Sequence, residues 1–336
     1  MHRPILAALL ILAGWIASAA AQEPTRLKLS LEFRVYGGTA ATINTEVGGF
    51  FKAEGLEVKV DGSSGSGEAI TRVAGGAYDF GVADVATLVE FAARNPAAAP
   101  KVVMLIFDRG AHMIVALKKS GITKPTDLIG KKLVTGQTDA TVRIFPSFLK
   151  LNGIDGSKIT QIPVDVRLRD SMLLRGEADA VLGFSYTTIF NLVGQKVPFD
   201  DISAIGLDEY GFDFYGNALI ASRAMIDTNP EVVRKVVRAM ARGWTASIRD
   251  PQAAIAAVVK TDPLTPVELE LQRFKYVVDR HIVTPATRAG GLGTADEAKL
   301  KNTIKVIAEG FDLPRVPGLD EIYDPRFLPP LADRKL

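Results

Sequence analysis

The 336-residue chain contains no cysteine. This absence excludes disulfide bonds, thiol nucleophiles, thiolate metal sites and iron–sulfur clusters, so the hydrophobic core must stabilise the fold. Histidine is scarce as well, with three in the whole chain. His112 and His281 are far apart in the sequence, and neither a His-Glu-x-x-His motif nor an EF-hand loop is present. We therefore expect neither a metal nor a cofactor.

An excess of charge of one sign is also lacking. Lysine and arginine number 40 against 38 aspartate and glutamate residues. A nucleic-acid-binding surface needs a concentration of basic residues, so no nucleic-acid partner is expected. No second long apolar run follows the N-terminal one, which predicts no transmembrane helix in the mature chain. The length allows more than one domain, and we expect a monomer.

The first 22 residues have the three parts of a secretory signal peptide. A short basic start, Met-His-Arg-Pro, precedes a mostly apolar run over 5–17 and a small-residue end over 18–22. The apolar run is shorter than the roughly 20 residues that a spanning helix needs. We expect residues 1–21 to be removed by cleavage after Ala21, an uncleaved N-terminal anchor being the alternative. Because no cysteine follows the cut, no lipid anchor is expected, and the predicted compartment is the periplasm.

Strand-like and helix-like patterns alternate along the mature chain. Alternating or continuous apolar residues predict strands at 27–33, 56–60, 80–83, 101–107, 113–117, 132–135, 159–162, 178–184 and 216–221. Helical spacing predicts helices at 42–53, 68–73, 85–93, 142–151, 171–175, 186–193 and 296–307, and one from 230 onward. Such alternation is typical of an α/β fold in which mostly parallel sheets carry helices on both faces. We predict one lobe from 26–110 plus 216–336 and a second lobe from 111–215.

The sequence contains no nucleophile elbow between a strand and a helix, no P-loop and no complete dinucleotide fingerprint. No Gly-x-Ser-x-Gly sequence joins a strand to a helix as a nucleophile elbow would. The loop Gly62-Ser-Ser-Gly-Ser-Gly-Glu68 lacks the Gly-Lys-Ser/Thr of a P-loop and the third glycine of a dinucleotide fingerprint. This loop is either a flexible turn into a helix or an anion contact at the N-terminus of that helix.

Candidate binding residues stand where predicted strands end, because open α/β sheets bind ligands beyond the carboxyl ends of their strands. Asp84 follows one such strand, and Thr138 and Asp139 follow another; each is either a helix cap or a ligand contact. Aromatic residues are concentrated near glycines, where a ligand can approach the backbone, or they pack in the core. We expect Phe184, Tyr186 and Phe214 to line the cleft.

Five motifs, in order along the chain, carry a resemblance to a known family. They are Gly48-Gly-Phe-Phe-Lys-Ala-Glu-Gly-Leu-Glu-Val58, Val73-Ala-Gly-Gly-Ala-Tyr-Asp-Phe-Gly-Val-Ala83, Asp127-Leu-Ile-Gly-Lys-Lys-Leu133, Leu174-Arg-Gly-Glu-Ala-Asp-Ala-Val181, and Tyr215-Gly-Asn-Ala-Leu-Ile-Ala-Ser222 with Asn229-Pro230. Together they resemble the periplasmic solute-binding proteins of the nitrate/sulfonate/taurine and NMT1/THI5-like (thiamine-precursor) type.

The resemblance implies a two-lobed, type II-like venus-flytrap fold with two crossing strands, and an ABC permease and ATPase as partners. Thr39, in the Gly-Gly-Thr-Ala stretch at 37–40, and Asn217, in the last motif, are further ligand-binding candidates. One branch of the family makes the thiamine pyrimidine with a histidine and a cysteine-rich iron motif. This chain has no cysteine, so we expect a binding protein and no enzyme. A ligand-sensing subunit of a membrane receptor, or an enzyme on the same fold, are the alternatives.

The class of solute remains open at this point. An aromatic cleft with few charges favours a flat, weakly charged molecule such as a pyrimidine or flavin. An arginine in the cleft would instead favour a sulfonate or an aromatic acid, and Arg109 and Arg143 are the arginines to consider, each also explained as a solvated or ion-paired side chain.

The signal peptide gives the first testable prediction. Because Ala19-Ala20-Ala21 supplies the small residues that signal peptidase requires, the exported protein should begin at Gln22. N-terminal sequencing of the protein from a periplasmic extract checks this. An exported protein that still begins with Met1 would contradict it.

Overall fold

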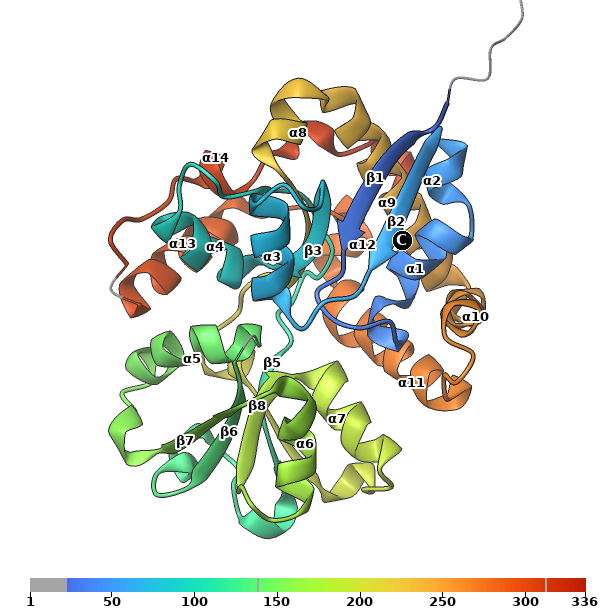
Figure 1. Ribbon diagram of the computed structural model, residues 1–336. Helices are drawn as coiled ribbons and strands as arrows, with labels where there is room; N and C mark the ends of the chain where they lie inside the picture. The colour runs from blue at the N-terminus through green and yellow to red at the C-terminus, as the bar shows by residue number, and fades with distance from the viewer. Residues whose placement is uncertain (1–22, 138, 312) are drawn as a thin grey trace, which may run out of the picture.

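The computed structural model describes residues 23–137, 139–311 and 313–336, so the expected signal peptide lies outside the described residues. Two five-stranded sheets, one above the other in Figure 1, form the centres of the molecule. Their strand orders are β2-β1-β3-β10-β4 and β7-β6-β8-β5-β9. The predicted α/β class is therefore confirmed.

The first sheet combines the early strands with one strand from much later in the chain. Its members are β1 (Thr25–Ser30), β2 (Leu56–Asp61), β3 (Phe80–Asp84), β4 (Lys101–Leu105) and β10 (Asn217–Ala221). Every residue of β3 and β10 is buried, as expected for central strands with helices on both faces. In β2, which lies at the edge, buried and exposed residues alternate over its first four positions.

The second sheet is continuous in sequence. Its members are β5 (His112–Leu117), β6 (Lys132–Gly136), β7 (Thr160–Val164), β8 (Ala180–Phe184) and β9 (Ile202–Gly206). Strand β9 was not predicted. Its apolar residues, Ile202, Ala204 and Ile205, form neither the strict alternation nor the continuous apolar run by which strands are recognised.

The sheets are mixed, whereas the sequence predicted mostly parallel ones. In the first sheet β10 runs antiparallel to both β3 and β4, and in the second β5 runs antiparallel to both β8 and β9. The remaining pairs are parallel. The physical reason is the connectivity. Segments 106–111 and 207–216 cross directly between the sheets, and the strand that follows each crossing enters its sheet from the side facing the other sheet.

Helices cover both sheets. They are α1 (Ala40–Val47), α2 (Phe50–Ala53), α3 (Ser66–Ala74), α4 (Val85–Arg94), α5 (Ala140–Leu151), α6 (Val166–Leu174), α7 (Ser185–Gly194), α8 (Arg223–Thr228), α9 (Pro230–Arg249), α10 (Pro251–Thr261), α11 (Val267–Val277), α12 (Pro285–Gly290), α13 (Glu297–Gly310) and α14 (Leu319–Ile322). None of the described helices is both long enough and apolar enough to cross a membrane.

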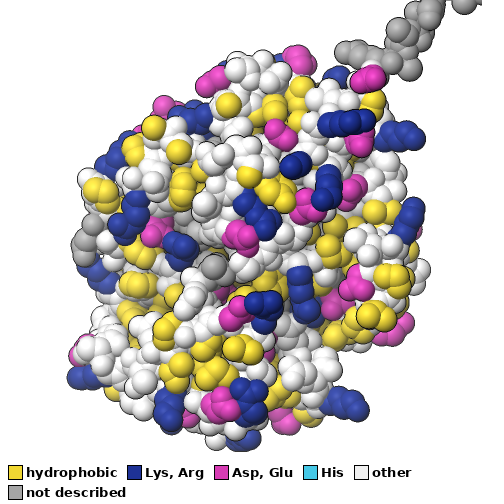
Figure 2. Space-filling model, viewed as in Figure 1, with side chains coloured by type: hydrophobic (Ala, Val, Ile, Leu, Met, Phe, Trp, Pro, Cys, Tyr) yellow, Lys and Arg dark blue, Asp and Glu magenta, His cyan; other side chains and the backbone are white. Residues whose placement is uncertain are grey.

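Two late helices hold the halves together from opposite sides in Figure 1. Helix α13 packs against α4 of the upper half and α5 of the lower half. Helix α11 packs against α7 of the lower half and against the short helix η1 (Gly37–Thr39) of the upper half. On the face shown in Figure 2, acidic and basic side chains are interspersed over both halves.

Close packing of α1 against α9 generates a prediction for stability. Gly243 of α9 lies against Thr45 of α1, and a Cβ on this glycine would lie 3.0 Å from the Thr45 Cα and closer still to its side chain. Because backbone atoms cannot move aside cheaply, Gly243→Ala should lower the free energy of unfolding by about 1–3 kcal/mol. Urea denaturation measures the change.

Gly75→Ala is the matched control. Gly75 is exposed at the C-terminal end of α3 with φ −82°, which alanine adopts without strain. Its effect should stay within about 1 kcal/mol. Equal destabilisation by the two substitutions would contradict the packing argument.

Candidate functional site

A narrow cavity of about 30 Å³ lies where the carboxyl ends of strands from both sheets meet. We call it the central cleft. Its lining residues come from both halves of the molecule: Glu32, Phe33, Tyr36, Ser64, Gly65, Ser66, Asp139, Ala140, Val166, Phe184 and Thr187. This volume is far below the roughly 300–1,000 Å³ of small-molecule pockets, so the halves are close together here. An organic solute of ordinary size requires them to separate.

Glu32 is the most unusual group of the central cleft. It follows β1 and is 5% exposed. Burial raises the pKa of its carboxyl from 4.5 to about 8, and a backbone hydrogen bond from its own amide lowers the pKa by a smaller amount. A carboxyl that keeps its proton near neutral pH donates a hydrogen bond as well as accepting one.

Aromatic rings surround Glu32. Phe33 and Phe184 line the cleft from opposite halves. The Tyr36 ring stacks on Tyr186 at a centroid separation of 6.2 Å, and Phe184 packs against Tyr186 at 5.6 Å. The cleft thus offers flat apolar walls and a few polar groups, a combination that suits a flat organic molecule.

Hydrogen bonds across the cleft join the halves. The Tyr36 hydroxyl lies 3.1 Å from the Thr187 Oγ1. Beneath the cleft, His112 Nε2 lies 3.0 Å from Asp84 Oδ2, and His112 Nδ1 lies 3.3 Å from Thr141 Oγ1. Asp84 belongs to the first sheet, whereas His112 and Thr141 belong to the second half. All three residues are buried, so this chain of hydrogen bonds connects the halves out of reach of solvent.

Some of the predicted site residues line the central cleft, and others are buried next to it. Asp139 and Phe184 line the cleft. Asp84 caps α4 by accepting from the Thr87 amide, as the capping alternative required, and it also bonds His112. Tyr186 and Asn217 are buried behind the cleft, where the Asn217 amide donates to the Tyr186 hydroxyl at 3.1 Å.

The remaining candidates lie elsewhere. The Thr39 hydroxyl accepts from the Tyr36 amide and donates to the Arg34 carbonyl, so it shapes the loop after β1. Phe214 is fully buried in the core of the second half and packs on Phe212. Thr138 lies outside the described residues. A ligand contact by any of these three stays a prediction.

The two arginines considered for an anionic ligand do not line the central cleft. The Arg143 guanidinium is paired with Glu90 at 3.2 Å, and the Arg109 amide donates to the His281 carbonyl. Asp139 is paired with the buried Arg169, which also binds Asp170. No arginine is among the described residues that line the central cleft.

Sequence reasoning missed Glu32, Phe33, Tyr36 and Thr187. Glu32 could have been found, because a carboxylate between Leu31 and Phe33 interrupts an apolar segment just after β1, as Asp84 does at the last position of β3. Thr187 gave no signal, since a threonine in the first turn of a helix is ordinary.

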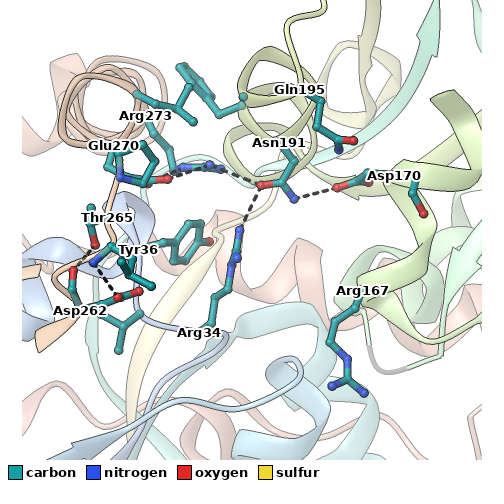
Figure 3. A pocket seen from close by; sticks show the side chains of 17 residues that line it. Arg34, Tyr36, Arg167, Asp170, Asn191, Gln195, Asp262, Thr265, Glu270 and Arg273 are labelled. Atoms are coloured by element: carbon teal, nitrogen blue, oxygen red, sulfur yellow. Dashed lines mark hydrogen bonds and ion pairs between the residues drawn. The ribbon is translucent and has the colours of Figure 1, made fainter. Parts of the chain in front are cut away.

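A second and larger cavity, which we call the lateral cavity, lies beside the central cleft. Its volume is about 420 Å³, and Tyr36 lines both cavities. Figure 3 shows its lining: Arg34, Val35, Tyr36, Arg167, Asp170, Ser171, Phe190, Asn191, Gly194, Gln195, Asp262, Leu264, Thr265, Pro266, Leu269, Glu270 and Arg273. Among the described residues, no group of three or more His, Asp and Glu side chains is arranged to hold a metal ion.

Comparison with known proteins identifies a family. A family model described as NMT1/THI5 like matches residues 40–254, more than half of the chain. Over 235 residues the chain is 27% identical to the 4-amino-5-hydroxymethyl-2-methylpyrimidine phosphate synthase of Aspergillus parasiticus, with 66% of this chain and 67% of that protein covered. It is 24% identical over 229 residues to the riboflavin-binding protein RibY of Chloroflexus aurantiacus, covering 67% of this chain and 63% of RibY.

Solved structures show the same fold. The alkanesulfonate-binding protein SsuA from Xanthomonas axonopodis pv. citri, bound to MOPS, matches with a TM-score of 0.68 at 15% identity. The match covers 90% of this chain and 99% of SsuA. The predicted periplasmic-binding-protein fold is thereby confirmed.

The buried carboxyl of Glu32 predicts a dependence of stability on pH. Its folded pKa of about 8 exceeds the unfolded value of 4.5. Unfolding above pH 4.5 therefore releases its proton, and the contribution of Glu32 to stability falls as the pH rises from 4.5 to about 8. Glu32→Gln removes this titration. As the pH rises from 4.5 to about 8, the free energy of unfolding of the variant should therefore increase relative to that of the wild type by roughly 2–5 kcal/mol.

Urea denaturation at a series of pH values measures this difference. The control is Glu57→Gln, which makes the same Glu-to-Gln change at an exposed side chain. A difference between Glu32→Gln and wild type that stays constant with pH would contradict the burial argument.

Proposed function

This chain belongs to the NMT1/THI5-like family, and we propose that it is a periplasmic solute-binding protein that captures a small organic molecule between its two halves and delivers it to an ABC importer. The observation that carries the proposal is the lining of the central cleft, to which loops of both sheets contribute. A molecule held there contacts both halves at once, so its binding free energy favours the closed arrangement.

The two sheets with their helices are the proposed lobes, divided at 26–110 plus 216–336 and 111–215. The crossing segments are the proposed hinge. They hydrogen-bond to each other, through the Ile106 and Phe107 amides to the Asn217 carbonyl and the Gly110 amide to the Phe214 carbonyl. A permease would distinguish the closed arrangement of the two lobes from the open one.

The chemistry of the cleft supports a flat solute with hydrogen-bonding groups. Phe33 and Phe184 supply apolar walls, and the protonated Glu32 carboxyl pairs with a molecule that presents both a donor and an acceptor, such as a pyrimidine or flavin ring. Two relatives, named as a pyrimidine phosphate synthase and a riboflavin-binding protein, agree with this class.

Catalysis is the second candidate function, because one relative is named as a synthase. The arrangement of Thr141, His112 and Asp84 resembles a nucleophile, base and orienting acid, yet Thr141 and Asp84 are fully buried. A substrate does not reach that hydroxyl in the structure described. We therefore favour binding without conversion.

Identification of the bound molecule tests the proposal. Native mass spectrometry of the protein from a periplasmic extract should show one solute per chain. After denaturation and refolding, the recovered solute should rebind unchanged and, at one hundred times its Kd, stabilise the protein by about 2.7 kcal/mol. Conversion of the solute during incubation would instead support the synthase alternative, and a protein that never retains a solute would contradict both.

A substitution locates the solute. Phe184→Leu keeps apolar volume but removes the ring, so the recovered solute should bind about tenfold more weakly in calorimetry. Phe199, which is 56% exposed and outside the cleft, provides the control Phe199→Leu. Equal affinities of the two variants would place the solute elsewhere.

A further inference from the structure

The lateral cavity lies next to the central cleft and is large enough for part of a solute. Its volume of about 420 Å³ falls within the range of small-molecule pockets. The loop after β1, helices α6 and α7, and the segment leading into α11 form its walls. The Tyr36 ring stands between the two cavities, with its hydroxyl bonded to Thr187.

Two guanidinium groups converge on one neutral atom in this cavity. Arg34 Nη2 and Arg273 Nη2 each lie 3.3 Å from Asn191 Oδ1, as the dashed lines of Figure 3 show. The amide oxygen is a weaker acceptor than a carboxylate, and Arg273 is already paired with Glu270 at 2.7 Å. The charge of Arg34 is therefore the one at this oxygen that an anion would neutralise.

Arg34 has no carboxylate partner among the residues that the structure describes. Aromatic rings hold its guanidinium in place, at 5.9 Å from the Phe33 centroid and 5.8 Å from the Tyr36 centroid. The backbone is fixed by Thr39, whose hydroxyl donates to the Arg34 carbonyl. The guanidinium is thus oriented toward the cavity without being neutralised by an acid.

Two of the three acids that line the cavity, Glu270 and Asp170, are paired with arginines. Glu270 accepts from the Gly37 amide at 2.6 Å and pairs with Arg273 at 2.7 Å. Asp170 pairs with Arg169 and accepts from the Asn191 amide.

Two other charged groups stand near the cavity mouth. Asp262 is exposed and accepts from the Leu264 amide. Arg167 pairs with Asp165 at 2.6 Å and points away from the other labelled side chains in Figure 3. Arg34 is therefore the cation available to a ligand.

We propose that the lateral cavity binds an oxyanion group of the solute, a carboxylate, sulfonate or phosphate, through the Arg34 guanidinium, while the flat part of the solute occupies the central cleft. This inference rests on the proposed function and narrows its solute to a ring with an anionic substituent. The planar fork of Arg34 matches two oxygens of such a group, and Asn191 and Gln195 supply neutral amides beside it.

Simple oxyanions test the site without knowledge of the solute. Sodium acetate, methanesulfonate and orthophosphate are titrated into the purified full chain at constant ionic strength, with sodium chloride as reference, and Kd is obtained from thermal stabilisation. At least one oxyanion should give a saturable response. Arg34→Gln should weaken that Kd at least about tenfold, the loss expected for a charge-assisted bidentate contact.

Arg167→Gln is the matched control, because it removes an arginine from the rim that is already paired with Asp165. Its Kd should stay within about twofold of the wild type. The relative responses to the three anions identify which group the solute carries. No saturable response from any anion, or equal loss in the two variants, would overturn the inference.

The failure of this inference is distinguishable from failure of the proposed function. If a solute is recovered from the protein and binds Arg34→Gln as tightly as wild type, the oxyanion site is contradicted, whereas solute capture is supported. If no solute is recovered and the oxyanions still bind through Arg34, the oxyanion site is supported, whereas solute capture is contradicted.

Discussion

The hydrogen bond between Asp84 and His112 is the constraint on which the arrangement of the two halves depends. It joins the last residue of β3 to the first residue of β5, directly after the chain has crossed from one sheet to the other. Both residues are buried, so loss of either partner would leave a polar group without water or protein to satisfy it. The Thr141 hydroxyl and the Ser66 hydroxyl extend this network to the helices that begin at the cleft. Movement of the halves must preserve these bonds or replace them.

The C-terminal third acts as a second tie between the halves. The buried pair of Glu270 and Arg273 on α11 reaches both: Glu270 accepts from the Gly37 amide of the first half, and Arg273 donates to the Tyr186 carbonyl of the second. A Cβ at Gly37 would lie 2.8 Å from Glu270 Oε2, so only glycine allows this approach. Removal of one member of a buried ion pair commonly costs about 3–5 kcal/mol. The helix that ties the halves also forms one wall of the lateral cavity, so the proposed oxyanion binding and the proposed closure would share these contacts.

Much of the fold could be predicted from the sequence, because apolar periodicity reports burial directly. Buried strands such as β3 and β4 and the one-sided apolar face of α9 are examples. The site was less accessible to prediction. Asp84 and Asp139 were found because strand ends mark the cleft, yet whether such a residue touches solute or caps a helix depends on its orientation, which spacing does not encode. Phe214 was selected for its neighbouring glycine, but packing on Phe212 placed it in the core. Arg34 could not have been singled out, since the cavity that it lines is formed by segments far apart in the sequence.

The central claim is that the halves close on a solute held between them. The absence of cysteine from the wild-type chain permits a direct measurement, because Thr71→Cys on α3 and Gln161→Cys on β7, both exposed, would carry the only two labels. Double electron–electron resonance between spin labels at these positions reports the separation of the halves. We expect a broad distribution of distances in the solute-free protein that narrows and moves to shorter values when the recovered solute saturates the protein. An identical distribution with and without saturating solute would contradict closure.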